Sequence, residues 1–273
     1  MAASEGTSIL HLMRTLIRHR LLTWELARRE ISDRYVGQLF GMFWLVGQPL
    51  IQMAVYLVTF GYVLGGRIGG GTGENYALFF LSGLVPWLTI NDYLTKSVMV
   101  VRGNASLVKQ VVFPLETLPI KALLGSLFTQ MFFLAGLMIF AAIAHGGIPV
   151  TFVAIPLLLL IQVIFLTGIG LAFSAVGTFV RDLREVMQLF SIVGLYLIPV
   201  VYSIESPSVP AILKVILYAN PFTYVVWCWQ DVFYHGAFVH PIAWVVSSIL
   251  AMGTLAAGNA LFQRLKLYFG NVL

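Results

Sequence analysis

The chain has 273 residues, of which 59% are hydrophobic and only 10% are charged. This composition excludes a large water-soluble domain, because too few polar side chains are present to cover one. The net charge of +5 comes from basic residues at the ends of apolar segments, so it does not indicate nucleic-acid binding. The single cysteine, Cys228, excludes an intramolecular disulfide and a multi-cysteine metal site.

Residues 1–40 are predicted to be a cytoplasmic segment that contains an amphipathic helix from about Ser8 to Ile31. Its apolar stripe consists of Ile9, Leu12, Met13, Leu16 and Ile17. A helix with such a stripe and basic flanks lies in the headgroup plane of a membrane. The alternative is a cytoplasmic helix that packs on a partner protein.

Residues 41–273 are predicted to form an all-α integral membrane domain with six transmembrane helices. Apolar segments of more than 20 residues without a charge cross a hydrocarbon core of about 30 Å as helix. The predicted spans are Gly41–Leu64, Tyr76–Val101, Ala122–Ala144, one within Ile148–Val180, Val186–Ile204 and Ile242–Phe262. The second carries Pro86, Asp92 and Lys96, so we expect its C-terminal half to leave the bilayer core.

Between the fifth and sixth spans, residues 205–238 are predicted to form a periplasmic re-entrant helical hairpin. Two apolar pieces within Val209–Tyr234 are separated by Asn220-Pro221, and each is too short to cross the bilayer. If the two pieces formed one kinked span instead, the C-terminus would lie on the other side of the membrane.

The distribution of Lys and Arg favours six spans. With six, the segments 1–40, 96–121, 181–185 and 263–273 share one side and hold 14 of the 16 basic residues. A seventh span would move Arg264 and Lys266 to the opposite side. The positive-inside rule therefore predicts six spans with both termini cytoplasmic.

Motifs for ATP binding and covalent catalysis are missing from the sequence. There is no Gly-x-x-x-x-Gly-Lys-Ser/Thr loop and no Gly-x-Ser-x-Gly sequence, and the five histidines lack metal-ligand spacing. We therefore expect no catalytic residues, no cofactor and no metal, and a transport subunit that depends on an external motor. An ion-coupled carrier is disfavoured, because Asp92 and Lys96 are the only charged candidates within the spans.

Five sequence elements, in this order, carry a resemblance to a known family. They are Arg34-Tyr35-Val36-Gly37-Gln38-Leu39-Phe40-Gly41 with Trp44 and Pro49; Leu81-Ser82-Gly83-Leu84-Val85-Pro86-Trp87; Asn104 to Pro114 with Glu116 and Pro119; Arg181-Asp182-Leu183; and Asn220-Pro221-Phe222. The chain resembles the membrane subunit of bacterial ABC exporters for polysaccharides and polyol phosphates, of the O-antigen type. Gln38 and Phe40 depart from the choices common in that family.

The resemblance implies a homodimeric permease of the bacterial inner membrane that works with two copies of a separate ATP-binding subunit. Its substrate would be a lipid-linked polysaccharide. The same fold with capsule, teichoic acid or a drug as cargo is the nearest alternative. A membrane-bound transferase and an ion-coupled carrier are alternatives of other classes.

Three groups of site residues follow from this resemblance. The cytoplasmic loop 102–116 is expected to contact the ATP-binding subunit through Asn104, Leu107, Val108, Lys109, Phe113 and Glu116. The expected channel lining is Trp44, Tyr56, Phe60, Phe190, Tyr196 and Tyr202. The expected contacts to the phosphates of the lipid anchor are Arg28, Arg29 and Arg34.

Each group also has a simpler interpretation. The loop could be solvated, with Asn104 capping a short helix that ends before Pro114. The aromatic residues could belong to the core or to interfacial belts. The arginines could bind anionic headgroups, at about 1 kcal/mol for each residue.

Overall fold

The computed structural model describes residues 9–33, 40–41, 43–59, 75–110, 113–206 and 209–273. All regular structure within these ranges is helical. Four helices are long and apolar enough to cross a membrane. They are α5 (Tyr76–Met99), α7 (Thr117–Ala144), α8 (Ile155–Phe179, which follows the short helix η4, Val150–Ala154) and α12 (Pro241–Leu265). They correspond to the second, third, fourth and sixth predicted spans.

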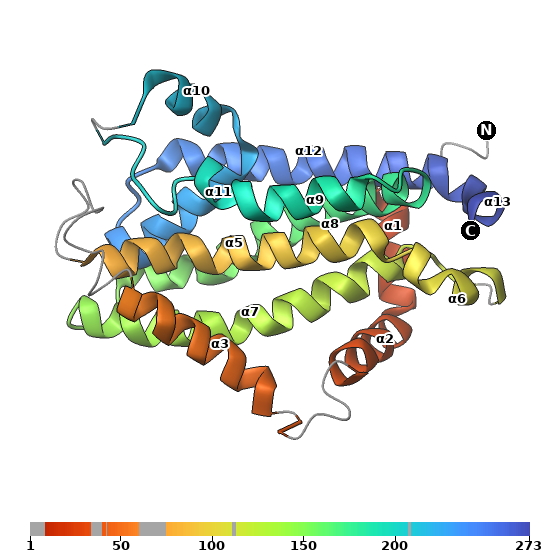
Figure 1. Ribbon diagram of the computed structural model, residues 1–273, viewed down its shortest axis with the longest axis horizontal. Helices are drawn as coiled ribbons and strands as arrows, with labels where there is room; N and C mark the ends of the chain where they lie inside the picture. Colours follow the sequence, from red (N-terminus) through yellow and green to blue (C-terminus); the bar gives the residue numbers. More distant parts are fainter. Residues whose placement is uncertain (1–8, 34–39, 42, 60–74, 111–112, 207–208) are drawn as a thin grey trace.

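These four helices form a bundle whose axes run along the length of the molecule (Figure 1). Helix α5 lies in its interior, and most of its side chains are buried. It packs against α7 and α8, and α8 packs in turn against α12. Because Tyr93 and Trp87 on α5 are fully buried, this helix forms the centre of the hydrophobic core.

Glycines allow the backbones of α8 and α12 to touch. A Cβ atom on Gly258 would lie 1.9 Å from the carbonyl oxygen of Gly168, and one on Gly168 would lie 2.3 Å from the Leu255 nitrogen. Within a membrane, small residues at a helix crossing permit such an approach, and the gain is close van der Waals packing. This contact attaches the C-terminal helix to the bundle.

The first predicted span is only partly described. Helix α3 covers Phe43–Tyr56, and a short π-helical stretch continues it to Thr59. It lies at the edge of the bundle and slants across α7, which it contacts together with α5 (Figure 1). The remainder of the predicted span, up to Leu64, lies outside the described residues.

The prediction of one continuous helix over Val186–Ile204 is wrong. Helix α9 covers Leu183–Val193, the 3-10 helix η5 covers Gly194–Leu197, and the chain is extended at Ile198. Pro199 accounts for this ending, because the residue before a proline avoids the helical conformation and proline has no N–H to donate.

The predicted break at Asn220-Pro221 is confirmed. Helix α10 (Ala211–Ala219) and helix α11 (Pro221–Gln230), continued by the π-helix η6 (Asp231–His235), meet at an angle of 89°. The Asn220 side chain accepts a hydrogen bond from the Phe222 backbone N–H at 3.0 Å and donates one to the Leu197 carbonyl at 2.8 Å. Both halves lie near the N-terminal end of α12 (Figure 1). That the pair is re-entrant stays a prediction.

The N-terminal region forms two helices, so the prediction of a single helix over Ser8–Ile31 is wrong. Helix α1 covers Ile9–Arg18 and α2 covers Arg20–Asp33, with His19 between them. Helix α1 packs against α12 and buries Leu12 of its apolar stripe, whereas Met13 and Ile17 of that stripe are exposed; α2 packs against α7. Part of the predicted membrane-facing surface therefore covers the bundle itself.

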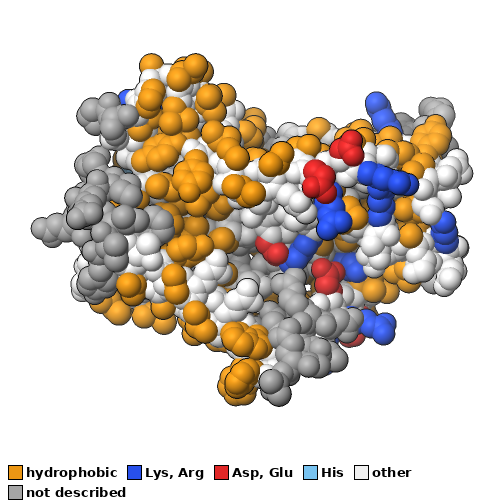
Figure 2. Space-filling model, in the orientation of Figure 1, with side chains coloured by type: hydrophobic (Ala, Val, Ile, Leu, Met, Phe, Trp, Pro, Cys, Tyr) orange, Lys and Arg blue, Asp and Glu red, His pale blue; other side chains and the backbone are white. Residues whose placement is uncertain are grey.

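Basic residues gather at one end of the molecule. This is the end from which α6 (Ala105–Gln110) and α13 (Phe269–Val272) project (Figure 1). The basic residues there belong to α1, α2, the C-terminal half of α5, the start of α7 and the last residues of α12. Figure 2 shows Lys and Arg side chains concentrated at this end, and a mainly hydrophobic surface at the other. We call these the basic end and the apolar end. Such an asymmetry is typical of a membrane protein whose basic end faces the cytoplasm.

The close contact between α8 and α12 makes a testable prediction. Gly258→Ala places a methyl group against the Gly168 carbonyl, so we expect the free energy of unfolding to fall by about 1–3 kcal/mol. Gly253→Ala on the same helix is the control, because a Cβ there meets nothing within 4 Å. Thermal denaturation of the purified proteins measures both. Equal Tm values for the two variants would contradict the contact.

Candidate functional site

The loop between α5 and α7 carries the short helix α6, which projects from the basic end of the bundle (Figure 1). It follows the 3-10 helix η3 (Arg102–Asn104). Leu107 and Val108 are half-buried and pack against the hydrophobic core, whereas Lys109 is exposed. Helix α6 therefore has one side fixed to the bundle and one side open to a partner.

Arg102 fixes the start of this loop to α8. Its Nε and one terminal guanidinium nitrogen both donate to the Thr178 carbonyl oxygen, at 3.0 and 2.8 Å. Thr178 lies at the C-terminus of α8, where carbonyl groups have no partner within the helix and a cation offsets the helix dipole.

Asn104 joins the loop to α7 and α2. Its side-chain nitrogen donates to the Val100 carbonyl at 2.6 Å, and its side-chain oxygen accepts from Lys121 Nζ at 3.0 Å. Lys121 in turn pairs with Glu30 on α2 at 3.5 Å. The expectation that Asn104 caps the following helix is not met, because its side chain bonds to the preceding turn and to Lys121 instead.

Glu116 fixes the end of the loop to the C-terminal helices. It is 2% exposed and accepts hydrogen bonds from Lys266 Nζ at 2.6 Å and Gln263 Nε2 at 2.8 Å. Burial alone would raise its pKa, but the hydrogen bonds, including that from Gln263, and the charge of Lys266 outweigh this effect and hold the pKa of Glu116 below its ordinary value. Glu116 thus positions the loop and offers no surface to a partner. Phe113 is half-buried against the core.

A basic cavity of about 580 Å³ lies beside this loop, between α2, α5 and α7. Arg29, Lys96 and Lys121 line it together with Asn104 and Glu30. Of the arginines predicted to meet phosphate, Arg29 is therefore in the cavity. Arg28 is exposed and, with Arg29, lines a separate hollow on α2, and Arg34 lies outside the described residues.

A second, polar cavity of about 400 Å³ lies deeper, between α3, α5, α7 and α9. Its polar lining consists of Gln48, Gln52, Thr89, Asn91, Asp92, Thr95, Ser126, Thr129, Gln130 and Ser191. The side chains also hold the helices together, since Ser191 Oγ donates to Asn91 Oδ1 at 2.7 Å.

The Asp92–Lys96 ion pair joins the two cavities. Asp92 lines the polar cavity and Lys96 lines the basic one, and Ser126 Oγ donates to Asp92 Oδ2 at 2.6 Å. The pair is packed against Ser126 of α7, so this half of α5 belongs to the bundle, and its departure from the bilayer core stays a prediction. Charged and polar groups thus lead from the basic end towards the middle of the bundle.

Sequence reasoning missed the polar cavity, although a signal was present. Polar residues recur on one face of three helices, for example Gln48 and Gln52, and Ser126, Thr129 and Gln130. This spacing of three or four residues places them on one face of a helix. A polar stripe along an otherwise apolar span faces the interior or a water-filled cavity.

The aromatic residues predicted to line a channel lie in different surroundings. Tyr196 is 58% exposed and Trp44 is 38% exposed. Tyr56 accepts a hydrogen bond at 3.2 Å from Gln52, which lines the polar cavity. The hydroxyl of Tyr202 donates to the Tyr196 carbonyl.

Phe190 packs within the aromatic core, with its ring centroid 5.3 Å from that of Trp87 and 5.7 Å from that of Phe222. Phe60 lies outside the described residues. The structure therefore brings Tyr56 to the polar cavity, leaves Trp44 and Tyr196 at the surface, and places Phe190 in a packing role.

Three curated proteins are similar to this chain over almost its whole length. Two are O-antigen export system permease proteins RfbA from Klebsiella pneumoniae, 27% identical over 255 residues and 26% identical over 252 residues. Each match covers 91% of this chain and 93% of the relative. The third, an O-antigen export system permease protein RfbA from Myxococcus xanthus, is 24% identical over 256 residues, which are 93% of this chain and 96% of the relative.

The family model described as ABC-2 type transporter matches residues 22–234. That match runs from α2 through α6 and both cavities to residue 234 in η6, which continues α11. The chain therefore belongs to the ABC-2 type transporter family and is a membrane subunit of this class of transporter.

Proposed function

We propose that the chain is the permease subunit of an ATP-driven exporter that moves a lipid-linked polysaccharide, similar to O-antigen, across the bacterial inner membrane. Two copies of the chain would form the transport path, and two copies of a separate ATP-binding subunit would supply the energy. The three similar proteins, all named as O-antigen export permeases, support this choice of cargo. We also propose that the chain crosses the membrane six times and that both of its termini lie in the cytoplasm.

The observation that carries the proposal is the attachment of α6. A short helix with an exposed face projects from the basic end, and Arg102, Asn104 and Glu116 tie its flanks to α8, α7 and the C-terminal segment. A displacement of α6 would be transmitted to all of these elements, because each of the three contacts involves a charged side chain that is partly or fully buried. We assign the contact with the ATP-binding subunit to the exposed Lys109 and to the parts of Leu107 and Val108 that stay accessible, with Phe113 behind them.

The transport path would run between two copies of the chain. Helices α3 and α9, which contribute to the lining of the polar cavity, carry exposed apolar side chains, such as Ile51 and Leu189. A second copy placed here would cover them and enclose the cavity. Trp44, Tyr56, Phe60, Tyr196 and Tyr202 would then offer aromatic surfaces along which a sugar chain can slide.

The basic cavity would receive the phosphate groups of the lipid anchor. Arg29, Lys96 and Lys121 line it, and arginine pairs well with phosphate oxygens. Glu30 and Asp92 pair with two of these cations, so the cavity binds an anion only moderately and can release it. Arg28 and Arg34 would contact the same headgroup from the membrane surface.

The assignment of α6 predicts an effect of charge reversal on subunit binding. Because Lys109 is exposed at the proposed interface, Lys109→Glu should raise the Kd for the ATP-binding subunit about tenfold. Lys214→Glu on α10 makes the same change at the apolar end and should leave the Kd unchanged. Equal effects of the two changes on the Kd, or no effect of the first, would contradict the assignment.

The proposed path predicts that the polar cavity contains water. Cys228 is buried, so single cysteines can be added to the natural chain without a labelling background. Residue 129 lines the cavity, so Thr129→Cys places a thiol there. Residue 131 lies at almost the same height along α7 but on an exposed apolar surface, so Met131→Cys is the control. Because the thiolate is the reactive form, a water-soluble thiol reagent should label position 129 at least roughly tenfold faster than position 131. Equal rates at the two positions would argue against a water-filled path.

A further inference from the structure

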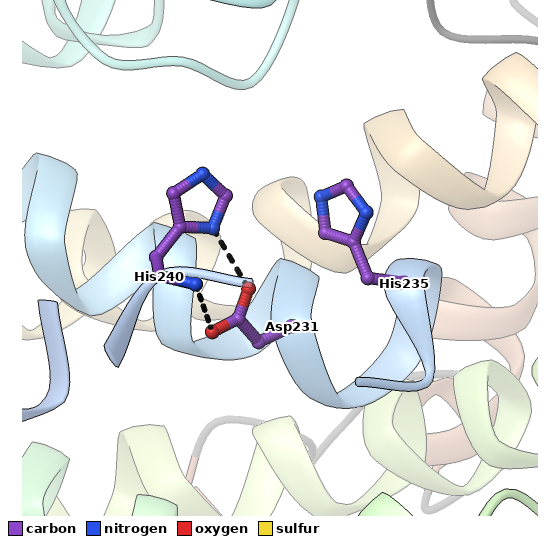
Figure 3. Close-up of side chains that lie close together, drawn as sticks. All are labelled: Asp231, His235 and His240. Carbon is purple, nitrogen blue, oxygen red and sulfur yellow. Dashed lines mark hydrogen bonds and ion pairs between the residues drawn. The ribbon is translucent and has the colours of Figure 1, made fainter. Parts of the chain in front are cut away.

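We propose that Asp231, His235 and His240 form a binding site for a divalent transition-metal ion of the zinc type at the apolar end of the bundle. One ligand atom from each residue lies within 4.8 Å of the others. Figure 3 shows the two imidazole rings side by side above the Asp231 carboxylate. This site is independent of the transport function proposed above, and the sequence alone predicts no metal site here.

The local fold brings the three residues together. Asp231 and His235 lie at the two ends of η6, about one turn apart. Gly236 then adopts a left-handed conformation, with φ of 60°, which ends the helix and turns the chain back. His240 thereby returns to Asp231, to which its backbone N–H donates at 3.0 Å and its Nδ1 at 2.8 Å.

The negative charge of the buried Asp231 carboxylate would be stabilised by a cation. The Asp231 side chain is 0% exposed, and apart from His240 its hydrogen-bond partner is the neutral Trp244 Nε1 at 3.1 Å. Within the described part of the chain no Lys or Arg forms an ion pair with it. A buried carboxylate without a positive partner is costly. A proton on His240 or a bound metal ion would balance this charge.

The donor set matches the chemistry of zinc-like ions. Two imidazole nitrogens and one carboxylate oxygen are typical ligands of Zn²⁺, and they leave a fourth position for water. On binding, the metal would replace the proton that His240 Nδ1 shares with Asp231 Oδ1; a neutral ring would then carry its proton on Nε2, and an imidazolium would release one proton to solvent. Ligand bonds of about 2.1 Å place the donor atoms about 3.4 Å apart, so the donor atoms, which lie within 4.8 Å of one another, would move closer together on binding.

The surroundings support such a site. His235 and His240 line a cavity of about 160 Å³ that also contains Glu205, through which an ion and its water can enter. The ring of His240 stacks on Trp227 with centroids 4.9 Å apart and planes 3° apart, which holds its orientation. A bound ion would tie η6, at the end of α11, to the start of α12, and would thus attach the bent α10–α11 pair to the last long helix.

Equilibrium binding of Zn²⁺ to the purified full-length chain, prepared with a tag that contains no histidine, tests the proposal. We expect one high-affinity ion per chain, a higher Tm in its presence, and no competition from excess Mg²⁺, which prefers oxygen ligands. His235→Ala should weaken Zn²⁺ binding at least about tenfold, because one of three ligands is lost. His19→Ala, between α1 and α2, is the control and should bind as the wild type does.

Co²⁺ provides a readout on the wild-type chain that does not depend on the folding of a variant. Bound by two imidazoles, a carboxylate and water, it should show the intense visible absorption of a four-coordinate ion, and Zn²⁺ should abolish it. Absence of this spectrum, or equal Zn²⁺ binding by the wild type and His235→Ala, would overturn the proposal. Loss of binding in His19→Ala would also overturn it, since the ion would then be held elsewhere.

Discussion

A charge in the low-dielectric interior of a membrane protein must have a partner, and the arrangement of this molecule depends on how its few internal charges are paired. The clearest case is Glu116, a buried carboxylate held by Lys266 and Gln263. This contact joins the start of α7 to the end of α12 and so fixes the loop that carries α6. Without the Lys266 ammonium, Glu116 would be a buried and uncompensated charge, so the loop and the C-terminal segment are positioned together.

The same constraint shapes the interior. Asp92 pairs with Lys96 and accepts a hydrogen bond from Ser126, at the point where the basic and polar cavities meet. A paired charge can line a hydrated path without the cost of an isolated ion, and it attracts a phosphate less strongly than a free cation does. At the apolar end, the buried Asp231 carboxylate accepts hydrogen bonds from His240 and from the neutral Trp244 N–H. Because no Lys or Arg of the described residues pairs with it, a metal ion is the partner that we propose. Family membership and the paired interior together favour a conduit driven from outside over an ion-coupled carrier.

Much of this could be predicted from the sequence, and the failures have physical causes. Long apolar segments with few or no charges predicted α5, α7, α8 and α12, because the thickness of the bilayer fixes the length of a span. Hydropathy could not predict that the helical segment of α9 and η5 ends at Leu197, just before Pro199 and within an apolar run, or that the N-terminal region is divided at His19. The roles of Glu116 and Arg102 depend on partners about 150 and 76 residues away. Nothing local distinguishes Gly168 and Gly258 from the other glycines, since their role appears only when α8 meets α12.

The central claim is that α6 transmits force through the contact of Glu116 with the C-terminal segment. The most direct test compares ATP hydrolysis with polysaccharide transport in proteoliposomes that contain the chain and its ATP-binding subunit. Glu116→Gln keeps the shape of the side chain but removes its charge, and Glu25→Gln on the exposed face of α2 is the matched control. The account predicts that Glu116→Gln still binds the subunit and hydrolyses ATP, while transport per ATP falls several-fold and the control is unchanged. Unchanged transport per ATP in Glu116→Gln would contradict it.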